Sequence, residues 1–145
     1  MTRKFAGLGD YAVCKLEDQW WIDGPKQNFA TTAPEKWNWK LMIRTPDFIG
    51  KKDLQQAVSV LIAKGKTPLV REVTLEPISE GLCVQMLHTG PYNQMDRTIS
   101  TMKTFAEQKN FEFHGRHHEI YLSDPRRVPP ERLRTILREP VKVKG

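Results

Sequence analysis

The stretch EGLCVQMLHTGPY, residues 80–92, marks the point where the pattern of the sequence changes from strand to helix. An apolar run from Leu82 to Leu87 closes on the turn-forming pair Gly90-Pro91, which is typical of a β-strand followed by a turn. Residues 93–109 then carry apolar and small side chains at spacings of three and four, which predicts an amphipathic helix. That stripe consists of Met95, Thr98, Ile99, Met102, Phe105 and Ala106.

The segments on either side of this unit extend the pattern. FEFHGRHHEIYLSD, residues 111–124, returns to the two-residue alternation of strands, and VREVTLEPIS, residues 70–79, is predicted to be a strand as well. One complete β-α-β-β unit is therefore expected. The segment PPERLRTILREPV, residues 129–141, predicts a short final helix, with Pro129 and Pro130 at its start, Glu131 in its first turn and Pro140 at its end.

The N-terminal half predicts a hairpin and a helix. YAVCKLEDQWWID, residues 11–23, and WNWKLMIRTP, residues 37–46, are rich in aromatic and branched side chains, and a polar, turn-forming segment separates them. From Asp53 onward, apolar residues recur at helical spacing until Gly65, which is expected to end the helix. The apolar stripe of this helix is Leu54, Ala57, Val58, Leu61 and Ile62.

Length and composition favour one soluble domain. The chain has 145 residues, 39% hydrophobic and 28% charged, and shows neither a membrane-length apolar run nor a secretory signal. A single domain over residues 1–145 and a cytoplasmic location are expected. The two cysteines, Cys14 and Cys83, lie in apolar runs without the spacing of a zinc or redox motif, so buried reduced thiols are predicted.

The net charge of +6 raises the question of nucleic-acid binding. Many of the basic residues lie near the chain ends, without the interleaved aromatic side chains that stack on bases, so a solvated basic face is the favoured interpretation. They are Arg3, Lys4, Arg126, Arg127, Arg132, Arg134, Arg138, Lys142 and Lys144. No nucleophile elbow, phosphate loop or dinucleotide motif is present, so no cofactor is expected. His117 and His118 are adjacent and diverge on a strand, so no metal site is expected either.

Three segments together resemble a known family. WNWKLMIRTPDF (37–48), EGLCVQMLHTGPY (80–92) and HHEIYLSDPRRVPPERLRTILREPV (117–141) are similar, in order and spacing, to the GyrI-like small-molecule-binding family. The resemblance spans about Tyr11 to Val141. It implies an α+β fold of duplicated β-α-β-β modules whose antiparallel sheets surround a ligand groove. It also implies drug sensing, as in multidrug-responsive activators, or hydrolysis of cyclopropane-bearing DNA-alkylating natural products.

Compared with that family, the sequence begins almost directly at the hairpin strand, so the first module is expected to be incomplete at its N-terminus. An uncovered sheet edge leaves unpaired backbone groups, which favours pairing with another chain. A homodimer is therefore predicted, and the helix at 53–64 is a candidate cover for the sheet.

Glu119 is the leading candidate for the site. On a strand, His117, Glu119 and Tyr121 share one face, whereas His118, Ile120 and Leu122 share the other, which is predicted to be the core side. Glu119 and Tyr121 are then expected to face the groove, where the resemblance places an acidic residue. The alternative is a structural salt bridge from Glu119 to a residue such as Arg44.

The hairpin carries all four tryptophans of the chain, Trp20, Trp21, Trp37 and Trp39. Neighbours on a strand face opposite sides, so Trp39 with either Trp20 or Trp21 is predicted to line the groove, and core packing is the alternative. Indole faces suit planar ligands and attract cations.

Two further candidates, His88 and Tyr92, lie where a strand meets a loop. For His88, the alternative is a hydrogen bond to the backbone at the strand end.

Two classes of function follow from these residues. In the first, the protein only binds planar or cationic compounds and sequesters or senses them. In the second, Glu119 acts as a general base toward water, Tyr121 or Tyr92 donates a hydrogen bond to the developing oxyanion, and burial raises the pKa of Glu119. The family name adds a third, weaker interpretation, inhibition of DNA gyrase by direct protein contact.

Overall fold

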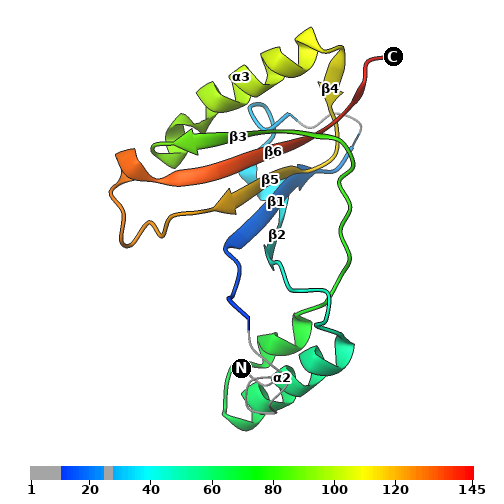
Figure 1. The fold of residues 1–145 in the computed structure, drawn as a ribbon, viewed down its shortest axis with the longest axis vertical. Coiled ribbons are helices and arrows are strands. Elements are labelled where there is room, and N and C mark those ends of the chain that lie inside the picture. The colour runs from blue at the N-terminus through cyan, green and yellow to red at the C-terminus, as the bar shows by residue number, and fades with distance from the viewer. Residues whose placement is uncertain (1–10, 25–27) are drawn as a thin grey trace. The chain divides into compact units, whose positions relative to one another are not determined.

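The structure, a computed structural model, describes residues 11–24 and 28–145. The chain forms two compact units (Figure 1). The first contains the described residues up to Cys14 together with Arg44–Ser79, and the second contains Lys15–Ile43 and Glu80–Gly145. Arg3 and Lys4 lie outside the described residues. One domain over residues 1–145 stays a prediction.

The first unit contains the predicted helix, α2, at Lys51–Ala63. The backbone N–H of Gly50 donates to Asp53 Oδ2 at 2.9 Å, and this hydrogen bond caps the N-terminus of the helix. The strand predicted over residues 70–79 was wrong: Pro68–Glu72 forms the 3-10 helix η2, and the rest of the segment pairs with no strand among the described residues. Pro68 fixes a helical backbone angle at the start of η2, and Thr67 Oγ1 caps it by accepting from the N–H of Leu69 at 3.4 Å.

The second unit is built on an antiparallel sheet with the strand order β2-β1-β5-β6-β3, and β4 pairs with β6 as well. The strands are β1 (Leu16–Ile22), β2 (Trp37–Ile43), β3 (Cys83–Thr89), β4 (Phe111–Phe113), β5 (His117–Tyr121) and β6 (Arg134–Val143). The predicted hairpin is confirmed as the β1–β2 pair, and the predicted α+β class is confirmed. Within the described residues β2 is an edge strand, and a homodimer that uses this edge stays a prediction.

The predicted C-terminal helix was wrong, and most of the segment belongs to an interior strand of the sheet. Only Pro130–Arg132 is helical, as the 3-10 helix η4, and β6 follows it. Arginine, leucine, isoleucine and glutamate are compatible with a helix, but β6 pairs with β3 on one side and with β5 and β4 on the other, and this pairing overrides local preference. Along β6, Thr135, Leu137, Glu139 and Val141 are buried at alternate positions, and Pro140 is buried between the last two.

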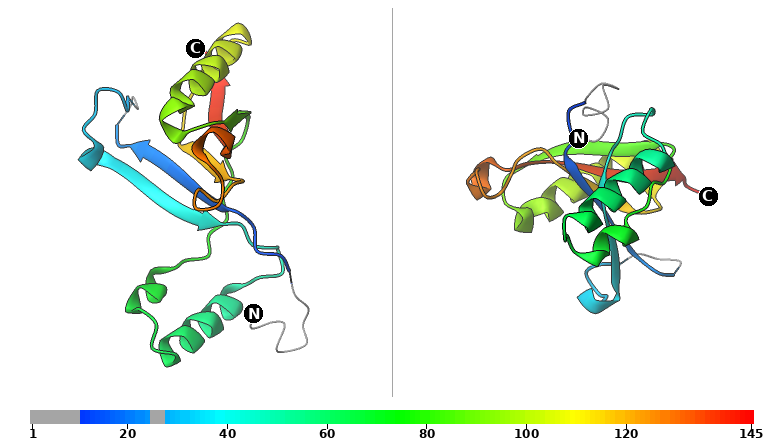
Figure 2. Two further views of the ribbon diagram at one scale, coloured as in Figure 1. Left: turned by 90° about the vertical axis from the view of Figure 1, so that its left-hand side faces the viewer. Right: turned by 90° about the horizontal axis from the view of Figure 1, so that it is seen from below.

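Helix α3, Met95–Gln108, confirms the predicted amphipathic helix and follows the 3-10 helix η3 at Tyr92–Gln94. Its buried residues Met95 and Met102 pack on Leu137 of β6. Val84, Ile99 and Phe113 complete this core from β3, α3 and β4. In Figure 2 the β1–β2 hairpin projects away from α3, so the helix covers one end of the sheet and leaves the hairpin uncovered by it.

Gly115 forms the turn that lets β4 and β5 pair with the same side of β6. Its φ of +81° lies in the left-handed region that glycine tolerates, and a Cβ there would approach two side-chain atoms of Pro140 to 3.3 Å. Pro140, predicted to stop a helix, instead accepts a hydrogen bond from the N–H of His114 at 2.9 Å. The turn therefore fixes where β5, and with it Glu119, begins.

Both cysteines are free, but the expected burial was wrong for Cys14, which is exposed and precedes β1, whereas Cys83 is partly buried. No helix in the described part of the chain is long and apolar enough to cross a bilayer.

The core supplies a direct test of stability. Leu137 is 0% exposed, whereas Leu82 is 59% exposed in the same unit. We expect Leu137→Ala to lower the free energy of unfolding by about 2–5 kcal/mol, because it removes buried contacts and leaves a cavity beneath α3. The matched variant Leu82→Ala should cost less than about 1 kcal/mol. Urea unfolding followed by circular dichroism measures both, and equal losses would contradict this view of the core.

Candidate functional site

The side chains around Glu119 form one connected set, here called the Glu119 network: Asp18, His117, Glu119, Tyr121 and Glu139. Asp18 lies directly opposite Glu119 in the β1–β5 register, so both side chains project from the same face of the sheet. Glu119 in turn lies opposite Leu137 in the β5–β6 register. The network therefore shares the face on which α3 packs. The prediction that Ile120 and Leu122 mark the core side was wrong, because the buried Leu137 lies on the side of Glu119.

Hydrogen bonds join the network into a chain. The hydroxyl of Tyr121 lies 2.6 Å from Asp18 Oδ2 and 2.6 Å from Glu119 Oε2. His117 Nε2 lies 3.0 Å from Glu119 Oε1, and His117 Nδ1 contacts Glu139 Oε1. The described partners of Glu119 are thus His117 and Tyr121, not the Arg44 salt bridge weighed from the sequence.

These contacts set the charges of the network. Burial lowers the pKa of His117, but its hydrogen bonds to Glu119 and Glu139 raise it to about 10, from 6.5. Both ring nitrogens face carboxylate oxygens, which accept and do not donate, so His117 is an imidazolium. Burial also raises the pKa of Tyr121 far above its ordinary value, and the hydrogen bonds with Asp18 and Glu119 act in the same direction.

The two facing carboxyls differ. Burial raises the pKa of Glu119, but the hydrogen bonds from His117 and Tyr121 outweigh burial, and the pKa lies below its ordinary value. The expectation of a raised pKa for Glu119 was therefore wrong. In Asp18 burial dominates and raises the pKa, helped by the charge of Glu119 and opposed by Tyr121, Trp20 and His117.

Aromatic side chains of the hairpin continue this face of the sheet. Trp20 and Trp39 are partners in the β1–β2 register, with ring centroids 6.4 Å apart, and Trp20 also contacts Trp37 at 6.3 Å. Trp39 is 58% exposed. We call Trp20, Trp37 and Trp39 the aromatic surface. Trp20 is opposite His117 in the β1–β5 register, so this surface adjoins the Glu119 network.

The structure does not bring Trp21 to this surface. Trp21 follows Trp20 on β1 and so faces the other side of the sheet, where the Arg116 guanidinium lies 3.7 Å from its ring centroid. Of the two alternatives for the partner of Trp39, the geometry favours Trp20.

Tyr92 lies beside the network. Its ring meets that of Tyr121 edge to face, with centroids 5.9 Å apart, and the residue is 40% exposed. Within the described part of the chain its hydroxyl makes no hydrogen bond. Burial raises the pKa of Tyr92, and the charges of Glu119, Asp124 and Asp18 add to this, so the hydroxyl stays a donor.

His88 is occupied within the protein. Its Nε2–H donates to the carbonyl oxygen of Pro91 at 3.0 Å, and its Nδ1 accepts from the hydroxyl of Thr98 at 2.8 Å. This is the backbone hydrogen bond weighed as the alternative for His88. The residue ties β3 to the start of α3 and so holds Tyr92 in place.

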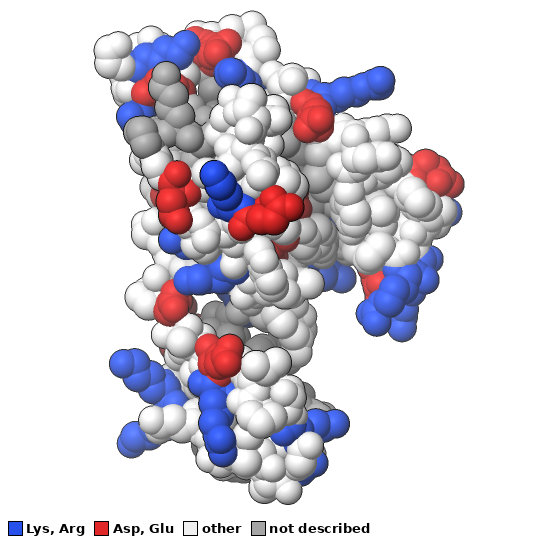
Figure 3. Space-filling model, turned by 180° about the vertical axis from the view of Figure 1, so that it is seen from behind, with Lys and Arg blue, Asp and Glu red and all other residues white. Residues whose placement is uncertain are grey.

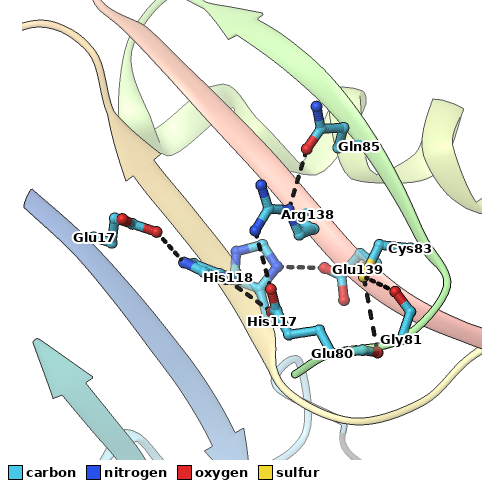
Figure 4. Close-up of polar contacts among 9 residues, drawn as sticks. All are labelled: Glu17, Glu80, Gly81, Cys83, Gln85, His117, His118, Arg138 and Glu139. Atoms are coloured by element: carbon cyan, nitrogen blue, oxygen red, sulfur yellow. Dashed lines mark hydrogen bonds and ion pairs between the residues drawn. The ribbon is translucent and has the colours of Figure 1, made fainter. Parts of the chain in front are cut away.

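A second polar cluster lies on the opposite face (Figure 4). His118 lies between Glu17 Oε1 and Glu80 Oε1, each 2.8 Å from a ring nitrogen, and Arg138 binds Glu80 at 3.0 Å and Gln85 at 3.1 Å. Hydrogen bonds to His118 and Arg138 lower the pKa of Glu80 although burial opposes them. The contacts of this cluster connect β1, β5 and β6 to Glu80, just before β3, which is a structural role. His118 was predicted on an apolar face and instead contacts the carboxylates of Glu17 and Glu80.

The basic C-terminal residues are partly neutralised by acidic neighbours. Arg126 pairs with Asp124 at 2.8 Å, and Lys142 pairs with Glu112 at 3.3 Å. On the face drawn in Figure 3, acidic and basic side chains are interspersed. Among the described residues, no group of three or more His, Cys, Asp or Glu side chains is arranged to hold a metal ion.

Asp18 and Glu139 are the site residues that the sequence did not reveal. Strand alternation puts Asp18 on the face of Trp20, but only the β1–β5 register puts it opposite Glu119. Glu139 was hidden because its segment was interpreted as a helix. Only the order of the strands in the sheet shows that these two residues belong to the site.

The raised pKa of His117 makes the stability of the protein depend on pH. Because the folded pKa of about 10 exceeds 6.5, this stabilisation is complete below pH 6.5 and is lost as the pH rises through 10. We expect the free energy of unfolding to fall by about 1.4 kcal/mol per pH unit between roughly pH 7 and 9.5.

This slope should be absent in His117→Gln and kept in His114→Gln, which replaces an exposed histidine. Urea unfolding at a series of pH values measures it. A His117→Gln protein with the slope of the wild type would show that the imidazolium is not the source.

Comparisons with known proteins agree with this geometry. A sequence model described as the GyrI-like small molecule binding domain matches residues 28–142. An uncharacterized conserved protein from Listeria innocua is similar in structure, with a TM-score of 0.86 and 36% identity over 96% of this chain and 69% of that chain. Comparison with curated proteins gave no match.

Two further Listeria innocua structures are described as hydrolases. One has a TM-score of 0.80 and 36% identity over 94% of this chain and 66% of its own. The other has a TM-score of 0.83 and 35% identity over 97% of this chain and 72% of its own. These matches confirm both the predicted family and its α+β fold. The chain belongs to the GyrI-like small-molecule-binding family.

Proposed function

We propose that the protein binds planar aromatic compounds of cationic or electrophilic character on the aromatic surface, and hydrolyses those that carry a strained cyclopropane. Such an activity would protect the cell from alkylating natural products. The observation that carries the proposal is the place of Glu119: a partly buried carboxylate with a lowered pKa, on the same sheet face as the exposed indole of Trp39. The description of two structural neighbours as hydrolases supports the catalytic part.

In the proposed reaction, Glu119 takes a proton from water as the water oxygen attacks a cyclopropane carbon. The strained C–C bond breaks, and its electron pair passes into the conjugated dienone, which becomes a phenolate. The hydroxyl of Tyr92 donates a hydrogen bond to that oxygen as its charge develops. Tyr92 suits this role better than Tyr121, whose hydroxyl is already engaged by Asp18 and Glu119.

Sequestration without chemistry is the second candidate, and one observation favours it. The lowered pKa of Glu119 makes this carboxylate a weaker base than an unpartnered buried glutamate. In that case Glu119 contributes negative charge that complements a cationic ligand, and the aromatic surface provides the contact area.

The catalytic role of Glu119 is tested by Glu119→Gln, which keeps the shape of the side chain and removes the base. We expect hydrolysis of a cyclopropane-bearing alkylator to fall by about 10²-fold or more, as is typical of general-base catalysis. Neutral planar ligands should still bind. The control Glu112→Gln changes a half-exposed carboxylate and should keep full activity. Product formation is followed by chromatography, and normal turnover by Glu119→Gln would exclude the general-base role.

The binding role of the aromatic surface is tested by a matched pair of tryptophan variants. Trp39→Ala should weaken the binding of a planar aromatic ligand by about tenfold, or roughly 1.4 kcal/mol, because it removes an exposed stacking face. Trp21→Ala removes an indole of the same hairpin from the opposite side of the sheet and should leave the affinity unchanged. Fluorescence titration measures both. Equal losses in the two variants would place the ligand elsewhere.

A further inference from the structure

The contacts of Tyr121 require a proton that the carboxylates alone do not supply. Its hydroxyl lies 2.6 Å from an oxygen of Asp18 and 2.6 Å from an oxygen of Glu119. A phenol has one O–H, and ionised carboxylates only accept hydrogen bonds. A separate proton for each of the two contacts requires one of the carboxyls to be protonated and to donate to the oxygen of Tyr121.

The surroundings assign that proton to Asp18. Glu119 accepts a hydrogen bond from the imidazolium of His117 at 3.0 Å, which favours the ionised form of Glu119. Asp18 is 3% exposed, forms no ion pair with a basic side chain among the described residues, and its buried Oδ1 accepts no hydrogen bond of normal geometry. A carboxyl in such surroundings favours its neutral form, and the pKa of Asp18 is raised accordingly, chiefly by burial.

With this assignment every contact in the network has one proton. Asp18 donates to Tyr121, Tyr121 donates to Glu119, and the two N–H groups of His117 donate to Glu119 and Glu139. The charges are then zero on Asp18, one negative on each glutamate and one positive on His117. The network has a net charge of about −1, which becomes about −2 when Asp18 ionises.

We propose that Asp18 holds a proton in the ligand-free protein and releases it to solvent when an organic cation binds over the Asp18–Glu119 pair. The O–H bond of the carboxylic acid breaks, the proton passes to water, and the new carboxylate faces the cation. This proposal rests on the proposed function, since it names the ligand class of the same site. The indoles of Trp20 and Trp39 border the pair and favour a cation over a neutral ring.

The groups that face Asp18 are consistent with this assignment. From β5 they are Glu119, whose charge disfavours ionisation, and Tyr121 and His117, which favour it, as does Trp20 on β1 itself; burial outweighs the groups that favour it. On the other side, β2 presents the apolar Leu41 directly opposite Asp18, so no basic side chain from that strand stabilises an anion. A bound cation would supply the missing positive charge.

The first experiment needs no ligand. Infrared spectra of the wild type at neutral pH should contain the carbonyl band of a protonated carboxylic acid, and Asp18→Asn should lack it. Asparagine has the same shape and can donate to Tyr121, and circular dichroism confirms that the variant folds. The control Glu131→Gln removes an exposed carboxyl and should leave the band unchanged. A spectrum without the band, or a band that persists in Asp18→Asn, would overturn the assignment of the proton.

The second experiment uses ethidium, a planar cation that does not titrate near neutrality. Calorimetry in two buffers of different ionisation enthalpy should show the release of up to one proton per ethidium bound by the wild type and none by Asp18→Asn. As the pH rises, the dissociation constant of ethidium for the wild type should fall by up to tenfold per pH unit, as long as Asp18 is protonated in the free protein. This pH dependence should be absent in Asp18→Asn. Glu131→Gln should behave as the wild type.

The outcomes separate this proposal from the proposed function. If a neutral planar ligand quenches tryptophan fluorescence but ethidium does not bind, the binding function stands and the cation proposal fails. If ethidium binds without proton release, the coupling to Asp18 is refuted. If neither compound binds, the ligand class fails together with the proposed binding function, while the infrared result still decides where the proton lies.

Discussion

The pairing of β6 with strands on both of its sides is the constraint on which the second unit depends. It gives β6 the alternation that buries Leu137 under α3 and turns Glu139 to the same face. Since β5 pairs with β6 on one side and with β1 on the other, the β5–β6 register places Glu119 opposite Leu137 and Tyr121 opposite Thr135. The site thus depends on one interior strand, β6, whose sequence pattern does not predict a strand.

Burial and hydrogen bonding act in opposite directions on the charges of the Glu119 network. Burial disfavours every charged group, yet hydrogen bonds from His117 and Tyr121 reverse its effect for Glu119 and do not reverse it for Asp18. The difference arises from position: Glu119 lies between His117 and Tyr121, whereas Asp18 shares the hydroxyl of Tyr121 with Glu119 and has the apolar Leu41 beside it. Two carboxyls in register can therefore hold different protonation states at one pH, as general acid–base chemistry requires.

The sequence predicted the α+β class, the hairpin, both α-helices and the strands at 83–89 and 117–121, because each of these has a clear local period. It did not predict β6 or the 3-10 helix η2, where pairing and a proline decide the outcome. Glu119 and Tyr121 could be predicted from the alternation along one strand, and the resemblance to the GyrI-like family supported them. Asp18 and Glu139 were not accessible, because contacts between strands far apart in the chain depend on strand order, which local period does not encode.

The face of the sheet that carries the site is divided in two. Under α3 it is an ordinary apolar core, and along β1 and β2 it carries the exposed indole of Trp39. The Glu119 network lies at the boundary, with Leu137 on one side and Trp20 on the other. A boundary position reconciles two demands that conflict elsewhere in a protein: it is dry enough to shift pKa values, yet adjacent to a surface on which a flat ligand can lie. A carboxylate deeper under α3 would have no access to ligand, and one farther out on β2 would have an ordinary pKa and no partner to hold it.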